Sequence, residues 1–460
     1  MKKMLIFLLA VMMLLTACNQ EAQATTPVEE VPVKKQESTV KAESVIEEID
    51  KELHLAEGFP LETEELPWTV DTSSAVYLQE LCDPKYEGRA AGSSGNRATA
   101  EWIEEQFVGM GLQKYPAFST YRQSFNSDVF EMLPGYAAIV STDGTETELE
   151  LGVDWTYTPS YEELDLTLPL SENVEDCKAG KAFLDATTTK QDYPRRVISV
   201  VSSDLNTNTG HFSRDGDENR SRIKVLPEVY EKLKEEGTKL HIKLPLAAQE
   251  GKAENVIAYL PGENSEHAVL LCAHFDGSGQ SGRLMPSAYD NASGMATLLQ
   301  TASWLSKADN LPCDVLIGAF NSEEIGLVGS QAFSTQIKSK YEQILVINID
   351  CVGWKDEAHV IYAENSQGVL RNDLAAALEL QYMGVDYASD QMSFREANMK
   401  SVLISQEANF YGGAANRIAH SYWDIADNLD TDSMDELAKK LCIWVLERGD
   451  MSVTPYVVYW

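Results

Sequence analysis

The sequence predicts an α/β protein with a mixed, mostly parallel central sheet flanked by helices, and three observations lead to this prediction. From about residue 250 onward, short apolar runs alternate with amphipathic helical patterns, as in α/β domains. Several of these runs end on a histidine or a carboxylate, as strands do where a sheet edge forms a ligand site. Between about residues 125 and 246, short strand patterns follow one another instead, which indicates a smaller β-rich inserted domain.

The first residues have the pattern of an export signal. Lys2 and Lys3 precede an apolar run that is too short to span a membrane as a mature helix. The run ends in Leu15-Thr-Ala-Cys18, which resembles the signal of a bacterial lipoprotein. That resemblance implies removal of residues 1–17 and lipidation of Cys18. We therefore expect an exported lipoprotein, anchored to the cell membrane with its main domain outside the cytoplasm.

Residues 18–65 are predicted to be a disordered tether, because they are polar and carry no large aromatic residue before Phe59. A short helix over residues 44–55 is the exception considered. The formal net charge of −35 argues against nucleic acid as a partner, since an acidic surface repels phosphates. Six cysteines follow Cys18, and none forms a CxxC pair, so buried free thiols are favoured over disulfides.

The main domain is predicted to comprise residues 66–124 and 247–460. Its first part contains a Gly/Ser-rich loop over residues 86–95 and then a helical pattern over residues 97–110 that ends at Gly111. The loop lacks the Gly-Lys-Ser/Thr of a phosphate-binding loop, so we interpret it as structural. Residues 125–246 form the predicted insert, in which His211 and His241 receive no catalytic role.

The candidate site residues of the second part share a position: each follows a strand-like run or begins a helix. They are His274, Asp276, Asp290, Glu323, Glu324 and Asp350. Two later histidines are candidates for a further ligand. His359 lies inside a strand-like run, where a half-buried or exposed structural role is favoured. His420 follows a Gly-rich segment, where a loop can present a ligand, and is the one we select.

Two histidines and three carboxylates provide the nitrogen and oxygen ligands that zinc, manganese or cobalt accept. One carboxylate can bridge two ions, as in two-metal hydrolases. The pair Glu323-Glu324 can supply one ligand and one free base, because adjacent side chains point in different directions. Asp276 is suited to accept the second N–H of the His274 imidazole and so to fix its tautomer.

These motifs, taken together and in this order, resemble the co-catalytic zinc aminopeptidases of peptidase family M28. The motifs are His274-Phe-Asp276, Tyr289-Asp-Asn-Ala-Ser-Gly294, Asn321-Ser-Glu-Glu-Ile-Gly-Leu-Val-Gly-Ser330, Asn348-Ile-Asp350 and the late His420. The resemblance covers about residues 75–125 and 250–450 and implies the zinc exopeptidase fold. The β-rich insert lies where some members carry a protease-associated domain.

The resemblance also implies roles for individual residues. His274, Asp290 and Asp350 would bind one Zn²⁺, and Asp290 would bridge to a second one. Glu324 and His420 would complete the second site. Glu323 would be the general base and Asp276 would orient His274. The implied reaction is removal of N-terminal residues from peptides, with Mn²⁺ or Co²⁺ as alternative metals.

The sequence departs from the family pattern at Gln391, where many members carry a histidine. No residue can be assigned to bind the oxyanion, and Tyr411 is considered for that role, although a pocket wall suits Phe410 and Tyr411 better. Three alternatives stay open: a carboxypeptidase or dipeptidase with the same metal centre, a one-zinc glutaminyl cyclase on the same fold, and a catalytically inactive peptide-binding lipoprotein.

Overall fold

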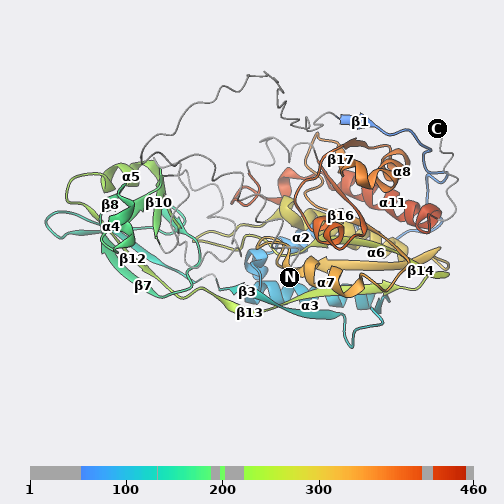
Figure 1. Ribbon diagram of the computed structural model, residues 1–460, viewed down its shortest axis with the longest axis horizontal. Coiled ribbons are helices and arrows are strands. Elements are labelled where there is room, and N and C mark those ends of the chain that lie inside the picture. The colour runs from blue at the N-terminus through green and yellow to red at the C-terminus, as the bar shows by residue number, and fades with distance from the viewer. Residues whose placement is uncertain (1–52, 132, 188–196, 203–221, 407–417, 452–460) are drawn as a thin grey trace, which may run out of the picture. The chain divides into compact units, whose positions relative to one another are not determined.

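The computed structural model describes residues 53–131, 133–187, 197–202, 222–406 and 418–451 (Figure 1). The predicted signal peptide, Cys18, His211, Phe410 and Tyr411 lie outside these residues. Within them, no helix has the length and apolar character needed to cross a membrane.

The main domain is built on one large sheet of ten strands. Its main path follows the order β1, β18, β17, β19, β16, β14, β15, β13, β2, and β3 pairs with β13. In chain order these strands are β1 (Leu53–Leu55), β2 (Gln113–Lys114), β3 (Arg122–Phe130), β13 (Ala248–Leu260), β14 (Asn264–His274), β15 (Cys313–Phe320), β16 (Gln343–Ile349), β17 (His359–Tyr362), β18 (Gln381–Met383) and β19 (Lys400–Gln406).

The sheet is mixed, and its parallel part contains the strands that end at the candidate site. β14 pairs in parallel with both β15 and β16, and β16 pairs in parallel with β19. Antiparallel strands adjoin this block on both sides, with β13 beside β15 and β17 beside β19. The near-continuous apolar runs of β14, β15 and β16 are explained by burial of both faces of the sheet. The predicted mixed α/β fold is confirmed, but the sheet is not mostly parallel as expected: among the described strands, four of its pairings are parallel and five are antiparallel.

Helices cover both faces of the sheet. Alternate residues of β14 point to opposite faces. Val269 and Leu271 belong to one core cluster, whereas Leu270 and Cys272 belong to another. The first cluster receives side chains from α2 (Ser74–Leu81), α3 (Ser94–Gly109), α6 (Ser293–Leu305), α8 (Gly368–Leu378) and α11 (Thr431–Arg448). The second receives them from α7 (Val328–Ile337) and α9 (Gln391–Glu396).

The β-rich part of the chain forms two smaller sheets around its own core. One has the order β6, β11, β10, β9, β8 and the other β5, β4, β12, β7. Their bounds are β4 (Tyr136–Val140), β5 (Glu146–Leu149), β6 (Trp155–Tyr157), β7 (Leu164–Leu168), β8 (Leu170–Ser171), β9 (Phe183–Asp185), β10 (Ser199–Ser202), β11 (Arg222–Val225) and β12 (Lys239–Leu244), with α4 (Val174–Lys178) and α5 (Pro227–Leu233). β3 pairs with β13 of the large sheet along its whole length, so the β-rich part begins after Phe130 rather than at residue 125.

The end of the predicted tether belongs to the main domain instead. Leu53–Leu55 form β1, which pairs with β18, so the helix considered for residues 44–55 is wrong at its described end. The carboxylate of Glu447 on α11 accepts hydrogen bonds from the backbone N–H groups of Glu62 and Thr63. The sheet edge and α11 thus order a segment that has little apolar surface of its own.

Candidate metal centre

The candidate residues gather at the carboxyl edge of the parallel strands. His274 is the last residue of β14, and Asp350 directly follows β16. The pair Glu323-Glu324 lies in the loop between β15 and α7. Because β15, β14 and β16 are neighbouring parallel strands, their carboxyl ends meet at one edge. The structure therefore brings together residues that are far apart in the sequence.

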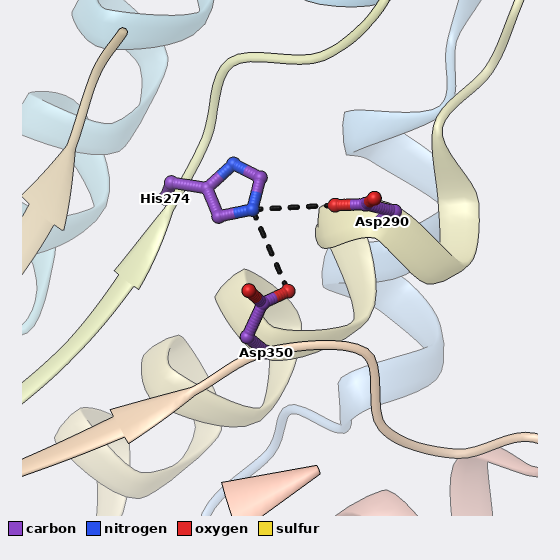
Figure 2. A group of neighbouring side chains, drawn as sticks. All are labelled: His274, Asp290 and Asp350. Atoms are coloured by element: carbon purple, nitrogen blue, oxygen red, sulfur yellow. Dashed lines mark ion pairs between the residues drawn. The ribbon is translucent and has the colours of Figure 1, made fainter. Parts of the chain in front are cut away.

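One group consists of His274, Asp290 and Asp350, which Figure 2 shows converging on the His274 ring. The Nε2 atom of His274 lies 3.3 Å from Oδ1 of Asp290 and 3.5 Å from Oδ1 of Asp350 (Figure 2). The imidazole is fully buried. Each residue offers one nitrogen or oxygen atom to a common point, the arrangement that a metal ion requires.

The second group consists of Asp290, Glu324 and His420. The Nε2 atom of His420 lies 2.8 Å from Oδ2 of Asp290 and 3.0 Å from Oε2 of Glu324. Asp290 thus turns one carboxylate oxygen toward each histidine. A carboxylate in this position can belong to two metal sites at once.

Three buried atoms of this centre have no hydrogen-bond partner within the described part of the chain. They are His274 Nε2, Glu324 Oε1 and Asp350 Oδ1. Buried polar atoms nearly always have a hydrogen-bond partner, and a place for a bound ion is one of the standard reasons for an exception. The donor set of imidazole nitrogens and carboxylate oxygens is one that Zn²⁺ and similar divalent ions accept. The residues present therefore fit a pair of divalent metal ions.

The electrostatics of the centre also favour bound cations. Burial acts to lower the pKa of His274, but the Asp350 and Glu323 carboxylates outweigh it and raise this pKa well above its ordinary value. For His420 too, burial is opposed by Glu324 and Asp290, and the pKa is raised. The carboxylates thus hold positive charge at this edge strongly, whether it is carried by a proton or by a metal ion.

Glu323 differs from the other candidates because it belongs to neither ligand group. Burial raises the pKa of its carboxyl group, and the nearby Asp350, Asp390 and Glu324 carboxylates act in the same direction, while His274 opposes them. Glu323 is thus close enough to feel these charges but is not part of either donor triad.

The Asp276 carboxylate was expected to accept the second N–H of the His274 imidazole, but its hydrogen-bond partners are different. The Nδ1 atom of His274 lies 3.2 Å from the backbone carbonyl oxygen of Asp276 and 3.6 Å from its carboxylate. The carboxylate instead accepts the backbone N–H groups of Glu323 at 3.1 Å and Glu324 at 3.2 Å. Asp276 therefore holds the loop that carries both glutamates, and its backbone is closer to the His274 ring than its side chain is.

Three residues that support the ligands received no role from the sequence. Asp424 accepts the backbone N–H groups of Tyr289 and Asp290 at 2.6 and 3.1 Å. The hydroxyl of Ser389 donates to Oδ2 of Asp350 at 2.6 Å. Asn291 donates to the carbonyl of Ile349. Asp424 comes soon after His420 in the motif Ser421-Tyr-Trp-Asp424, and this proximity was the available signal.

Gln391, the departure from the expected pattern, has a structural place. Its side-chain oxygen accepts a hydrogen bond from Asn348 at 3.2 Å, and its amide nitrogen donates to the Tyr387 carbonyl. It thereby packs against the end of β16.

The six cysteines after Cys18 are free thiols, as expected, and all but Cys82 are buried.

The fold and this centre define a class of protein: a mixed α/β protein with two adjacent candidate metal sites sharing one carboxylate. Residues 255–445, which contain every candidate ligand and Glu323, match peptidase family M28. The match covers about two fifths of the chain, so this part of the protein is similar to the M28 metallopeptidases.

A curated relative is the protein named probable lipoprotein aminopeptidase LpqL of Mycobacterium tuberculosis (strain ATCC 25618 / H37Rv), which is 25% identical over 228 residues. That match spans 42% of this chain and 45% of the relative, so less than half of the relative's length is covered.

Two solved structures have the same fold. One is a zinc aminopeptidase from Bacillus subtilis, with a TM-score of 0.61 and 16% identity, covering 82% of this chain and 95% of that one. The other is an aminopeptidase from Aneurinibacillus sp. strain AM-1, with a TM-score of 0.58 and 19% identity, covering 83% of this chain and 95% of that one.

Proposed function

We propose that this protein is a two-zinc aminopeptidase that removes N-terminal residues from peptides. The observation that carries the proposal is the position of Asp290 between two histidines, with one carboxylate oxygen toward each. The names of the curated relative and of the two solved structures, all aminopeptidases, favour this specificity over the other exopeptidase reactions.

In this proposal, His274, Asp290 and Asp350 hold one Zn²⁺, and Asp290, Glu324 and His420 hold the other; Mn²⁺ or Co²⁺ are alternatives that the same donors accept. When bound, such a metal pair supplies an acidified water and a polarised scissile carbonyl. Asp424 and Ser389 fix the orientation of Asp290 and Asp350 through the hydrogen bonds described above.

Glu323 is the proposed general base. Its carboxylate accepts the proton of the attacking water and then delivers it to the nitrogen of the leaving amine, so that the carboxylate is regenerated in each turnover. Asp276 keeps Glu323 and Glu324 at their positions by binding their backbone N–H groups. The two adjacent glutamates can therefore serve separately as base and ligand.

We also propose that the protein acts outside the cytoplasm, held to the membrane by a lipid on Cys18. The motif Leu15-Thr-Ala-Cys18 supports this proposal, as does the name of the curated relative, which includes the word lipoprotein. Radiolabelled palmitate should be incorporated into the wild-type chain and not into Cys18→Ser.

The activity is tested with a panel of peptides in two forms, one with a free N-terminal amine and one N-acetylated. We expect release of the N-terminal residue only from the free-amine peptides, loss of release after chelation, and recovery when Zn²⁺ is restored. Release from the acetylated peptides as well, or release that persists after chelation, would contradict a metalloaminopeptidase.

A further inference from the structure

Arg89 is a fully buried arginine whose hydrogen bonds all end on backbone carbonyl groups among the described residues. Nε donates to Phe275 at 2.9 Å, one terminal nitrogen donates to Leu81 at 2.6 Å and to Pro286 at 2.9 Å, and the other donates to Ser287 at 2.8 Å. A guanidinium group presents five N–H donors in a rigid planar fork, so it can hold several chain segments at fixed separations.

Three of the four carbonyl groups that Arg89 binds belong to segments that carry candidate ligands, and the fourth, that of Leu81, ends α2. Phe275 lies between His274 and Asp276, and the pair Pro286-Ser287 leads into the turn that contains Asp290. One side chain therefore joins the loop after β14 to the segment that carries the shared carboxylate. Arg89 itself is far from both segments in the sequence. It lies at the end of the short helix η1 (Pro84–Arg89).

The backbone next to Arg89 continues the same contact. The carbonyl of Arg89 accepts the N–H of Gly277 at 3.2 Å, and the carbonyl of Gly88 accepts the N–H of Gly279 at 2.9 Å. Gly88 has a positive φ of 69°, and a Cβ atom there would lie 2.2 Å from the Gly279 carbonyl oxygen. Only a glycine allows the two backbones to approach this closely.

Asn96 extends the contact to the third ligand-bearing loop. Its amide nitrogen donates to the side-chain oxygen of Asn321 at 3.1 Å, and the amide nitrogen of Asn321 donates back at 2.9 Å. The Asn96 nitrogen also donates to the Arg89 carbonyl at 3.0 Å. Because Asn321 follows β15 and begins the loop with Glu323 and Glu324, the paired amides join this loop to Arg89.

We propose that Arg89 and Asn96 are positioning residues that hold three ligand-bearing segments in register, so that the affinity for metal depends on η1 and the start of α3, which lie outside residues 255–445. The inference rests on the proposed function, since it requires that His274, Asp290 and Glu324 bind metal. Burying a guanidinium group without a bonded carboxylate is costly, and this cost is offset here by the four carbonyl bonds and by the negative charge of the centre. Asp424, Asp276 and Asp290 supply that charge.

The test compares Zn²⁺ affinity of the metal-free full-length protein in three forms: wild type, Arg89→Lys and Arg97→Lys. Arg97 is the matched control, because it lies nearby in the first turn of α3, is exposed and bonds only the Gly92 carbonyl among the described residues. Lysine keeps the charge at position 89 but cannot span the four carbonyls. We expect Arg89→Lys to weaken Zn²⁺ binding by about 10- to 100-fold, as loss of other residues that orient ligands does, and Arg97→Lys to bind like wild type.

Affinity for Zn²⁺ is measured by competition with a fluorescent chelator. The temperature is kept well below the thermal unfolding midpoint of each metal-free form. A role in folding alone would lower that midpoint and leave the Zn²⁺ affinity unchanged, which would overturn the proposal. Asn96→Ala provides a second test, which decides the matter if Arg89→Lys does not fold. It should weaken Zn²⁺ binding about tenfold, the lower end of that range, and wild-type affinity in this variant would likewise count against positioning.

The outcomes also separate this inference from the proposed function. A wild-type protein that binds Zn²⁺ and cleaves peptides, with variants that bind Zn²⁺ equally well, would remove only the positioning role. A wild-type protein that binds no Zn²⁺ would overturn both.

Discussion

At the scale of single residues, the centre depends on Asp290. Its two carboxylate oxygens face two different histidines, so any rotation of the side chain would disturb both groups. Asp424 holds the backbone that carries this side chain by accepting the N–H groups of Tyr289 and Asp290. Burial acts to raise the pKa of Asp290, but His420 and His274 outweigh it and keep that pKa below its ordinary value. The carboxylate is thereby held ionised, as a bridging ligand must be.

The first prediction concerns the base. Glu323→Gln should retain both metal ions, because Glu323 is in neither ligand group. Its turnover should fall by about 100- to 10,000-fold, since the amide cannot accept the proton of the water. The measurement is kcat together with the metal content per chain. Glu263→Gln, at an exposed turn, is the control. Metal-loaded Glu323→Gln that turns over like wild type would remove Glu323 from its role.

At the scale of elements, β17 contains a histidine that the sequence interpretation placed nearer the surface. His359 lies in a strand, as expected, but the strand is covered and its side chain is buried. Its Nε2 atom has no hydrogen-bond partner within the described residues. Burial lowers the pKa of this imidazole to about 4, with Asp430 acting against the shift and Lys440 adding to it.

The second prediction follows from this low pKa. The unfolded chain binds a proton at His359 below about pH 6.5, whereas the folded protein does so only near pH 4. Folding is therefore increasingly disfavoured as the pH falls from 7 to 4, by about 3 kcal/mol for this group. His359→Phe should remove that part of the pH dependence. The check is denaturant unfolding of both proteins across this range, and identical slopes in free energy against pH would contradict the buried neutral imidazole.

The ends of the parallel strands show how much of the centre could be predicted from the sequence. Apolar runs that stop at His274, Phe320 and Ile349 mark the strand ends correctly, because buried parallel strands are apolar on both faces. The partners of the supporting groups could not be predicted in this way. The Asp276 carboxylate binds two N–H groups from a loop 47 and 48 residues away, and nothing in its local sequence indicates that choice.

At the scale of the whole molecule, the centre combines residues from segments that lie far apart in the sequence. The ligand candidates come from the end of β14, from the segments that follow β15 and β16, from the turn with Asp290 and from the segment around His420. Arg89 and Asn96 connect the N-terminal part of the domain to them. Buried carboxylates that face one another without a cation repel each other. Metal binding should therefore stabilise the folded state as well as provide the chemistry.

The third prediction is that removal of metal lowers the unfolding temperature. A metal that binds only the folded chain stabilises it by about 3 kcal/mol at a free concentration 100-fold above its dissociation constant. Calorimetry should show a lower midpoint after chelation and recovery after Zn²⁺ is added. Asp290→Ala should lose most of this metal-dependent shift. An unchanged midpoint in the wild-type protein after complete chelation would show that the centre does not bind metal.

The sequence by itself determined the α/β class, the strand ends and the types of residue available as ligands, because periodicity and residue chemistry are local properties. Only the tertiary structure decided how these residues combine: that Asp290 faces both His274 and His420, that Asp276 holds the glutamate loop, and that residues 53–65 pack on the main domain. The physical reason is that these relations are distances between segments far apart in the chain. Such distances exist only once the sheet has formed and its helices have packed against it.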